Sequence, residues 1–265
     1  MHRHDPYAAL RIPSFRRFMT GAFLLNVGVG AQSVALGWEI YERTDDPLAL
    51  GFVGLVTAIP MFLITLPAGY LADRFDRRIV IRVSLVLMTI TSILLAVASL
   101  RRATVVVMYA ILFIDAAAVV SGGPSRTAIL PRLVPPDIFE NAVAWRTSIG
   151  QISAVAGPAV GGVLVLIGPP VAYSVNAMAS LVFFVLLSGV KLHASAPPPS
   201  TGDGDVPPRK ATVRESVARM ARLVFEGLAF LKTRPIILAA ITLDLFAVLF
   251  GGAVYLLPIY AKDIL

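Results

Sequence analysis

The sequence contains no cysteine, and this absence excludes disulfide bonds and thiolate metal sites. Charged residues are also scarce: they make up 15% of the 265 residues, whereas a soluble domain has about a quarter. Hydrophobic residues make up 57%. A larger core cannot explain this excess, because the surface of a soluble protein must still be covered by polar groups. A lipid-facing surface removes that demand, so we expect an integral membrane protein.

Residues that hold metals or phosphates are missing from the apolar segments. The three histidines all lie outside these segments, at His2, His4 and His193. This placement excludes a histidine-ligated metal inside the membrane. The sequence also lacks the G-x-x-x-x-G-K-S/T loop that cradles nucleotide phosphates, so ATP-driven pumping is unsupported. We expect no cofactor. The net charge is +7, but the basic residues flank apolar segments, which favours membrane lipid over nucleic acid as a partner.

Seven apolar segments reach roughly the 20 residues that a helix needs to cross a bilayer. Helices are expected because they satisfy their backbone hydrogen bonds within one segment. The first segment is too long for the apolar region of a cleaved signal peptide. We therefore expect an all-α polytopic membrane protein with spans near Phe18–Tyr41, Leu48–Ala72, Ile79–Leu100, Thr104–Gly123, Ala144–Ile167, Val171–Val190 and Ile236–Tyr260.

The basic residues predict the orientation of the chain. If the N-terminus is cytoplasmic, all but four of the 23 lysines and arginines fall on the cytoplasmic side; the exceptions are Arg43, Arg101, Arg102 and Lys262. Cytoplasmic loops of membrane proteins carry such an excess of Lys and Arg. We expect a multi-pass protein of the plasma (inner) membrane with a cytoplasmic N-terminus.

The connection 191–234 differs from the other loops. It opens with a stretch rich in Pro, Ser and Gly at 194–208. Residues 212–232 then show the apolar spacing of an amphipathic helix, which either is a solvated linker or lies along the membrane surface. The predicted domains are a six-helix bundle over 1–190, a cytoplasmic loop over 191–234, and the first helix of a second bundle over 235–265.

The second connection is short, charged and patterned. It reads G-Y-L-A-D-R-F-D-R-R, with Gly69, Asp73, Arg74, Arg77 and Arg78 at fixed offsets. The arginines alone would be read as a topology anchor. The full pattern resembles the loop 2–3 signature of the major facilitator superfamily, G-x-x-x-D-R-x-G-R-R, although Asp76 stands where the second glycine is usual. The resemblance implies that Asp73 and the arginines latch the two halves of a transporter in one state.

The fifth span carries a second pattern. Small residues recur at Gly150, Ser153, Gly157 and Gly161, which forms one stripe on a helix and predicts close helix packing. Pro158 removes one backbone donor and predicts a kink. The segment from Gly157 to Gly162 resembles the G-P-x-x-G-G motif of exporters in this superfamily; its motif residues are Gly157, Pro158, Gly161 and Gly162. Packing alone would also produce such a stripe.

The stretch between spans four and five reads G-P-S-R, then L-P-R-L-V-P, then Asn141-Ala142. It resembles the branch of the superfamily that contains the enterobactin exporter and related drug and macrolide efflux proteins. The resemblance covers nearly the whole chain. It implies a twelve-helix protein in two halves, of which this chain would supply the first half and one further helix, and it implies a monomer.

Four polar residues inside the spans are the candidate substrate or proton pathway. Asp115 lies at the middle of span four, Asp244 lies in span seven, and Asn26 and Gln32 lie in span one. A carboxyl at the bilayer centre generally faces a cavity or a partner. We expect Asp115 to exchange protons; the alternative is a structural carboxyl bonded to a neighbouring helix. Glu39, near the outer end of span one, is expected to be wetted.

These features together predict a secondary transporter. The favoured function is proton-coupled export of a small amphiphilic molecule, drug-like or siderophore-like, by alternating access. The alternatives are an uptake permease of the same superfamily, a membrane-embedded enzyme, and a membrane scaffold. An enzyme would need a cluster of nucleophile, base or metal ligands that the sequence does not offer. A scaffold would not need Asp115.

Overall fold

The computed structural model describes residues 5–190 and 242–243. In this part of the chain the long helices are α1 (Pro13–Thr44), α2 (Pro47–Arg74), α3 (Arg77–Leu100), α4 (Val105–Ala128), α5 (Phe139–Ile167) and α6 (Pro169–Ser188). Three short 3-10 helices join them: η1 (Ala9–Arg11), η2 (Leu130–Arg132) and η3 (Pro136–Ile138). The predicted cytoplasmic loop and Asp244 lie outside the described residues, as does the predicted seventh span apart from Thr242 and Leu243, which are helical.

The first six predicted spans are confirmed as helices. All six are long and apolar enough to cross a membrane. The fourth and fifth differ from the prediction at the ends that line the cavity described below. The fourth span was expected to stop at Gly123, but α4 continues through Pro124 to Ala128. The fifth was expected to begin at Ala144, but α5 begins at Phe139. The extension of α4 brings Arg126 onto a helix, whereas Arg146 already fell within the predicted fifth span.

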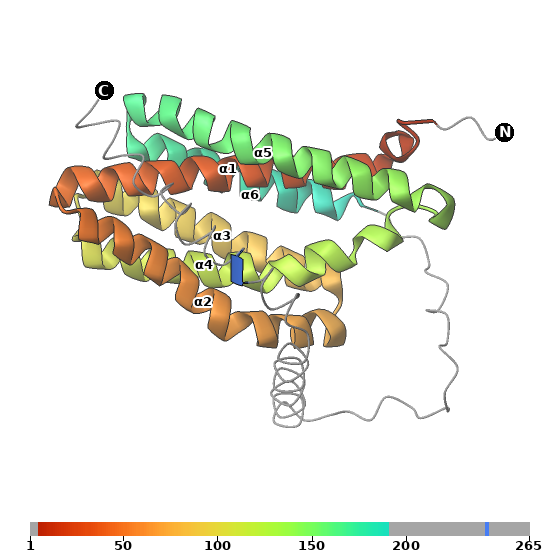
Figure 1. Cartoon of the computed structure of the whole chain (residues 1–265), viewed down its shortest axis with the longest axis horizontal. Coiled ribbons are helices and arrows are strands. Elements are labelled where there is room, and N and C mark those ends of the chain that lie inside the picture. The colour runs from red at the N-terminus through yellow and green to blue at the C-terminus, as the bar shows by residue number, and fades with distance from the viewer. Residues whose placement is uncertain (1–4, 191–241, 244–265) are drawn as a thin grey trace. The chain divides into compact units, whose positions relative to one another are not determined.

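The helices pack in a pattern that relates the first three to the last three (Figure 1). α1 packs against α5 and α6, and α4 packs correspondingly against α2 and α3. α3 and α6 pack against each other. Exchanging α1, α2 and α3 for α4, α5 and α6 maps these contacts onto one another. This is the pairing expected of two three-helix repeats, the arrangement found in many secondary transporters.

Small residues set the contact between α1 and α5. A Cβ placed on Gly157 would lie 3.1 Å from the Cα of Gly30, so the two backbones touch directly. One turn later, a Cβ on Gly161 would lie 2.8 Å from the Cα of Ala31. Close backbone approach of this kind is what small residues permit in membrane helices. The predicted stripe thus packs against α1 at Gly157 and Gly161, and Ser153 is buried, whereas a Cβ on Gly150 would meet no atom within 4 Å.

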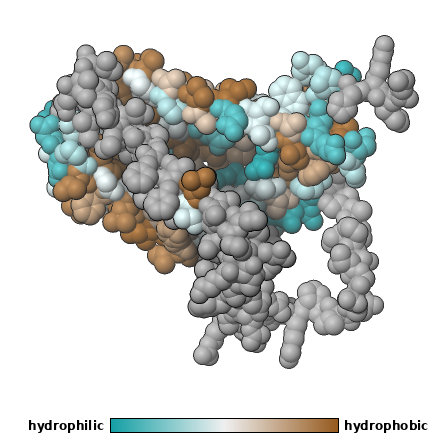
Figure 2. Space-filling view, in the orientation of Figure 1, coloured by the Kyte–Doolittle hydropathy of each residue, from teal (hydrophilic) through white to brown (hydrophobic). Residues whose placement is uncertain are grey.

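The surface of the bundle is hydrophobic to a degree that suits lipid or a second membrane domain. Large apolar side chains stand exposed on several helices, among them Phe62, Val106, Val155 and Leu166. Figure 2 shows such residues over much of the described surface, while hydrophilic residues gather near the end where α5 begins. A soluble protein rarely exposes apolar area on this scale. The surface therefore agrees with a multi-pass membrane protein.

The turn between α2 and α3 accounts for the departure from the loop 2–3 signature. Asp76 is the N-cap of α3, and its carboxylate accepts a hydrogen bond of 2.8 Å from the backbone N–H of Arg78. Asp is among the preferred N-cap residues because it satisfies a free backbone donor of the first turn. Its φ of −58° requires no glycine. A carboxylate cap at Asp76 thus takes the position that the signature gives to glycine.

A candidate substrate cavity and two buried polar clusters

A cavity of about 560 Å³ lies between α1, α4 and α5. Its walls come from the first half of α1, the last turn of α4 and the first half of α5, which are the ends that the sequence predicts to be cytoplasmic. The volume falls in the range of small-molecule sites, roughly 300 to 1,000 Å³. The lining residues are Phe18, Met19, Ala22, Asn26, Gly123, Arg126, Thr127, Arg146, Thr147, Ile149, Gly150 and Gln151.

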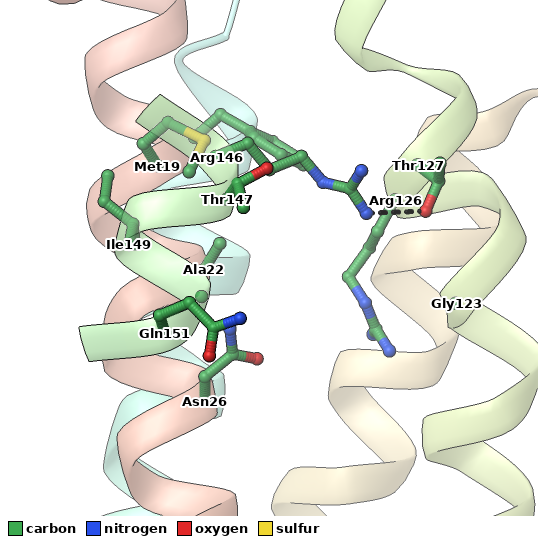
Figure 3. Close-up of a pocket in the computed structure, with 12 residues that line it drawn as sticks. Met19, Ala22, Asn26, Gly123, Arg126, Thr127, Arg146, Thr147, Ile149 and Gln151 are labelled. Atoms are coloured by element: carbon green, nitrogen blue, oxygen red, sulfur yellow. Dashed lines mark hydrogen bonds between the residues drawn. The ribbon is translucent and has the colours of Figure 1, made fainter. Parts of the chain in front are cut away.

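Two arginines dominate the cavity, and Figure 3 shows both side chains in the space between α4 on one side and α1 and α5 on the other. Arg146 of α5 reaches across to α4, where its Nη2 donates a hydrogen bond of 2.9 Å to the hydroxyl of Thr127. Arg126 of α4 donates from Nη2 to the carbonyl of Val119 at 2.8 Å. Its buried Nη1 has no hydrogen-bond partner among the described residues. Among the described residues that line the cavity, none is Asp or Glu.

The absence of a side chain at Gly122 leaves room for the Arg126 side chain along α4. A Cβ placed on Gly122 would lie 2.7 Å from the Arg126 Nη1, so a larger residue at that position would displace the guanidinium. The sequence prediction missed Arg126 because it ended the fourth span at Gly123. Arg126 follows Asp115 by eleven residues, about three helical turns, which puts both on one face of α4. That spacing was the signal available in the sequence.

Asp115 lies elsewhere, buried among α1, α3 and α4 with 4% of its surface exposed. Its carboxylate accepts hydrogen bonds from the Gln32 Nε2, at 2.9 Å, and from the hydroxyl of Thr91. The Gln32 Oε1 in turn accepts from Ser92 at 2.8 Å and from Asn176 at 3.0 Å. In the part of the chain that the structure describes, no ion pair involves Asp115. The structure thus brings Gln32 and Asp115 together and leaves Asn26 apart, in the cavity.

A second buried cluster surrounds Glu39 and corrects the expectation that this residue is wetted. Glu39 is 3% exposed. Arg43, one turn later on α1, forms an ion pair with it, and the Tyr173 hydroxyl donates to it at 2.7 Å. The hydroxyl of Ser99 is a further donor. The prediction was wrong because two of the partners that satisfy Glu39, Ser99 and Tyr173, come from α3 and α6, which sequence position alone does not reveal.

The arginines of the loop 2–3 pattern bind the ends of other helices. The Arg77 Nη1 donates 2.7 Å to the carbonyl of Ala128, the last residue of α4. The Arg78 Nη2 donates 2.6 Å to the carbonyl of Val190, just beyond α6. Cations are favourable at helix C-termini, where carbonyls lack intrahelical partners. These two arginines therefore tie α3 to α4 and α6. The surroundings of Gly69, Asp73 and Arg74 lie outside what the structure describes.

Comparison with known proteins agrees with these features. Residues 4–263 match a family model described as transmembrane secretion effector, a family of the major facilitator superfamily. The chain belongs to this family. The resemblance inferred from the loop 2–3 and helix 5 patterns is thereby confirmed, and the chain is a multi-pass membrane protein of a transporter superfamily.

Several curated relatives carry names that describe transport. The chain is 25% identical to the staphyloferrin A transporter of Staphylococcus aureus over 152 residues, 57% of this chain and 38% of that protein. It is 29% identical to the enterobactin exporter of Shigella dysenteriae over 188 residues, 71% and 45% of the two chains. It is 27% identical to macrolide efflux protein A of Streptococcus pyogenes over 132 residues, 49% and 33% of the two. Each match covers less than half of the relative.

Proposed function

We propose that this chain is part of a secondary transporter that exports a small amphiphilic molecule from the cytoplasm by alternating access. The observation that carries the proposal is the cavity between α1, α4 and α5, which combines apolar walls at Phe18, Met19 and Ile149 with two cationic groups. A site of mixed character between the helices of a bundle is typical of small-molecule recognition. Relatives named as siderophore and macrolide exporters support export as the direction.

The position of the cavity is compatible with export. Its walls are the helix ends that the distribution of lysine and arginine assigns to the cytoplasm. An exporter must collect its substrate from that side, so a cavity there is suited to the loading step. An uptake permease, the second candidate, would release its substrate there instead. The direction of transport therefore needs a measurement of its own.

Proton coupling is proposed to use Asp115. The Thr91 hydroxyl has one proton and three acceptors in reach: the Asp115 carboxylate, the Leu87 carbonyl at 3.0 Å and the Met88 carbonyl at 3.1 Å. When Asp115 is charged, Thr91 donates to it. When Asp115 is protonated, it donates to Thr91, which turns its own proton to a backbone carbonyl. Both protonation states are therefore hydrogen-bonded without any change in packing, which is what a reversible proton site needs.

The test uses the full-length protein in proteoliposomes with an imposed pH gradient. A panel of siderophores, macrolides and other amphiphilic compounds is offered on the cytoplasmic side, and accumulation on the other side is measured with and without a proton ionophore. We expect gradient-dependent accumulation of at least one compound, abolished by the ionophore. Movement only in the opposite direction would support the permease, and no movement of any compound in either direction would refute the proposed function.

A further inference from the structure

The charge of the cavity says more about the chemical class of its ligand than its volume does. Of the twelve described residues that line it, two are arginines and none is acidic, so this described lining carries a net positive charge. Arg126 is half-buried, and a half-buried cation is costly unless it is paired, whereas Arg146 is exposed at the mouth of the cavity. Arg126 has only a neutral carbonyl partner, and Arg146 has only a neutral hydroxyl. Within the described residues neither arginine has a carboxylate partner.

We infer that Arg126 and Arg146 form an anion site, and that the molecule bound in this cavity carries a carboxylate or phosphate group. This inference rests on the proposed function in one respect, namely that the bound molecule is the transported solute. The buried Nη1 of Arg126, which has no hydrogen-bond partner among the described residues, can donate a hydrogen bond to such an anion. Guanidinium groups match carboxylate and phosphate oxygens with paired hydrogen bonds, and these charge-assisted bonds are about twice as strong as neutral ones.

The rest of the wall indicates what accompanies the anion. Amides from Asn26 and Gln151 and hydroxyls from Thr127 and Thr147 offer further hydrogen bonds. Phe18, Met19 and Ile149 offer apolar contact on the same wall. A fitting ligand therefore combines an anionic group with neutral polar groups and an apolar part. A cationic amphiphile would meet two like charges and no acidic group, so the site discriminates against it.

The experiment measures equilibrium binding rather than transport. Citrate, a tricarboxylate, is titrated by calorimetry into the full-length protein in phosphatidylcholine nanodiscs, with uncharged trimethyl citrate as the comparison ligand. We expect saturable citrate binding that weakens as ionic strength rises from 0.05 to 0.3 M, roughly an order of magnitude for a site of this charge. Trimethyl citrate should not bind. Equal binding of the two ligands, or binding of neither, would overturn the inference.

Variants assign the binding to the two arginines. Arg126→Gln and Arg146→Gln should each weaken citrate binding at least tenfold, and Arg146→Lys should weaken it less. Arg101→Gln removes the same charge from an exposed position outside the cavity and should leave binding unchanged. Size-exclusion profiles confirm that each variant is folded. The salt dependence is measured on the unaltered protein, so the inference stays testable if a variant does not fold. Wild-type affinity in both glutamine variants would overturn it.

A second lipid composition separates a solute from a lipid headgroup. In nanodiscs containing phosphatidylglycerol, unchanged citrate affinity supports a solute site, whereas loss of citrate binding would assign the same arginines to a headgroup and overturn the solute assignment. Citrate binding in a protein that transports nothing would sink the proposed function and leave the anion site standing. Export confined to neutral or cationic compounds, with no citrate binding, would leave the function and sink the anion site.

Discussion

The side-chain amide of Gln32 donates a hydrogen bond of 2.9 Å to the buried carboxylate of Asp115, which joins α1 to α4 inside the bundle. This contact and the one from Thr91 leave the carboxylate with donors on both oxygens. Asp115 is therefore held in place by neutral groups alone, and its protonation can change without breaking an ion pair. The first prediction follows from this arrangement.

Asp115→Asn in the complete protein should abolish proton-driven export and leave folding intact. Asparagine keeps an acceptor for Gln32 and presents its amide to Thr91, which then donates to the Leu87 carbonyl. The packing is preserved, and only the titration is lost. Export is measured against a substrate gradient over a range of pH, with thermal unfolding as the control for folding. A variant that still concentrates substrate with unchanged pH dependence would show that Asp115 is structural and that coupling lies elsewhere.

Gly157→Leu should destabilise the bundle strongly, while Gly162→Leu, five residues further along the same helix, should not. A side chain at Gly157 must enter the backbone contact with α1, where the Cα of Gly30 would lie 3.1 Å from the new Cβ. A Cβ at Gly162 meets nothing within 4 Å. Overpacking typically costs about 1 to 3 kcal/mol or more. The measurement is the melting temperature of the two purified variants; equal values would mean that the contact with α1 is not maintained.

Removal of Arg43 should lower the stability of the protein, because it leaves the buried Glu39 carboxylate without its cation. Arg43→Ala leaves Glu39 without its cation, and breaking a buried ion pair from one side costs about 3 to 5 kcal/mol. The double variant Glu39→Gln, Arg43→Met removes both charges and should recover most of the lost stability. Thermal unfolding of the single and double variants provides the comparison. A double variant less stable than Arg43→Ala would contradict this account of the cluster.

Cysteine labelling should fix the orientation, and the cysteine-free sequence makes the experiment direct. Cysteines placed at Asp45, after α1, and at Arg102, after α3, are expected to react with an impermeant thiol reagent from outside intact cells. A cysteine at the exposed Phe75, between α2 and α3, should react only after permeabilisation. The reverse pattern would invert the topology and place the Arg126 cavity on the outer side.

The sequence predicted the helices well because each span needs about 20 apolar residues, a local property. It also predicted the small-residue stripe of α5, since helical spacing alone places Ser153, Gly157 and Gly161 on one face. The partner of that stripe was not predictable, because nothing local to α5 points to α1. The same limit applies to Gln32 and Asp115, which were each singled out by their cost in a membrane without any indication that they bond to each other.

Helix ends were the weaker part of the prediction, and the consequence was functional. A proline often ends a helix because it lacks a backbone donor, and the fourth span was predicted to end at Gly123, the residue before Pro124. The structure carries α4 through it for one more turn, and Arg126 lies on that turn. The cavity arginine was thus assigned to a loop. Membrane helices tolerate proline because neighbouring groups satisfy the freed backbone carbonyl.

The direct contact between Gly30 and Gly157 limits how the protein can move. Where side chains separate two helices, rotamer changes allow small sliding motions, but here backbone meets backbone and no such layer exists. In the proposed transport cycle, α1 and α5 are therefore expected to move together. Access would change by rotation of the bundle as one rigid body, and a pair of spin labels on these two helices would report one constant distance in every state.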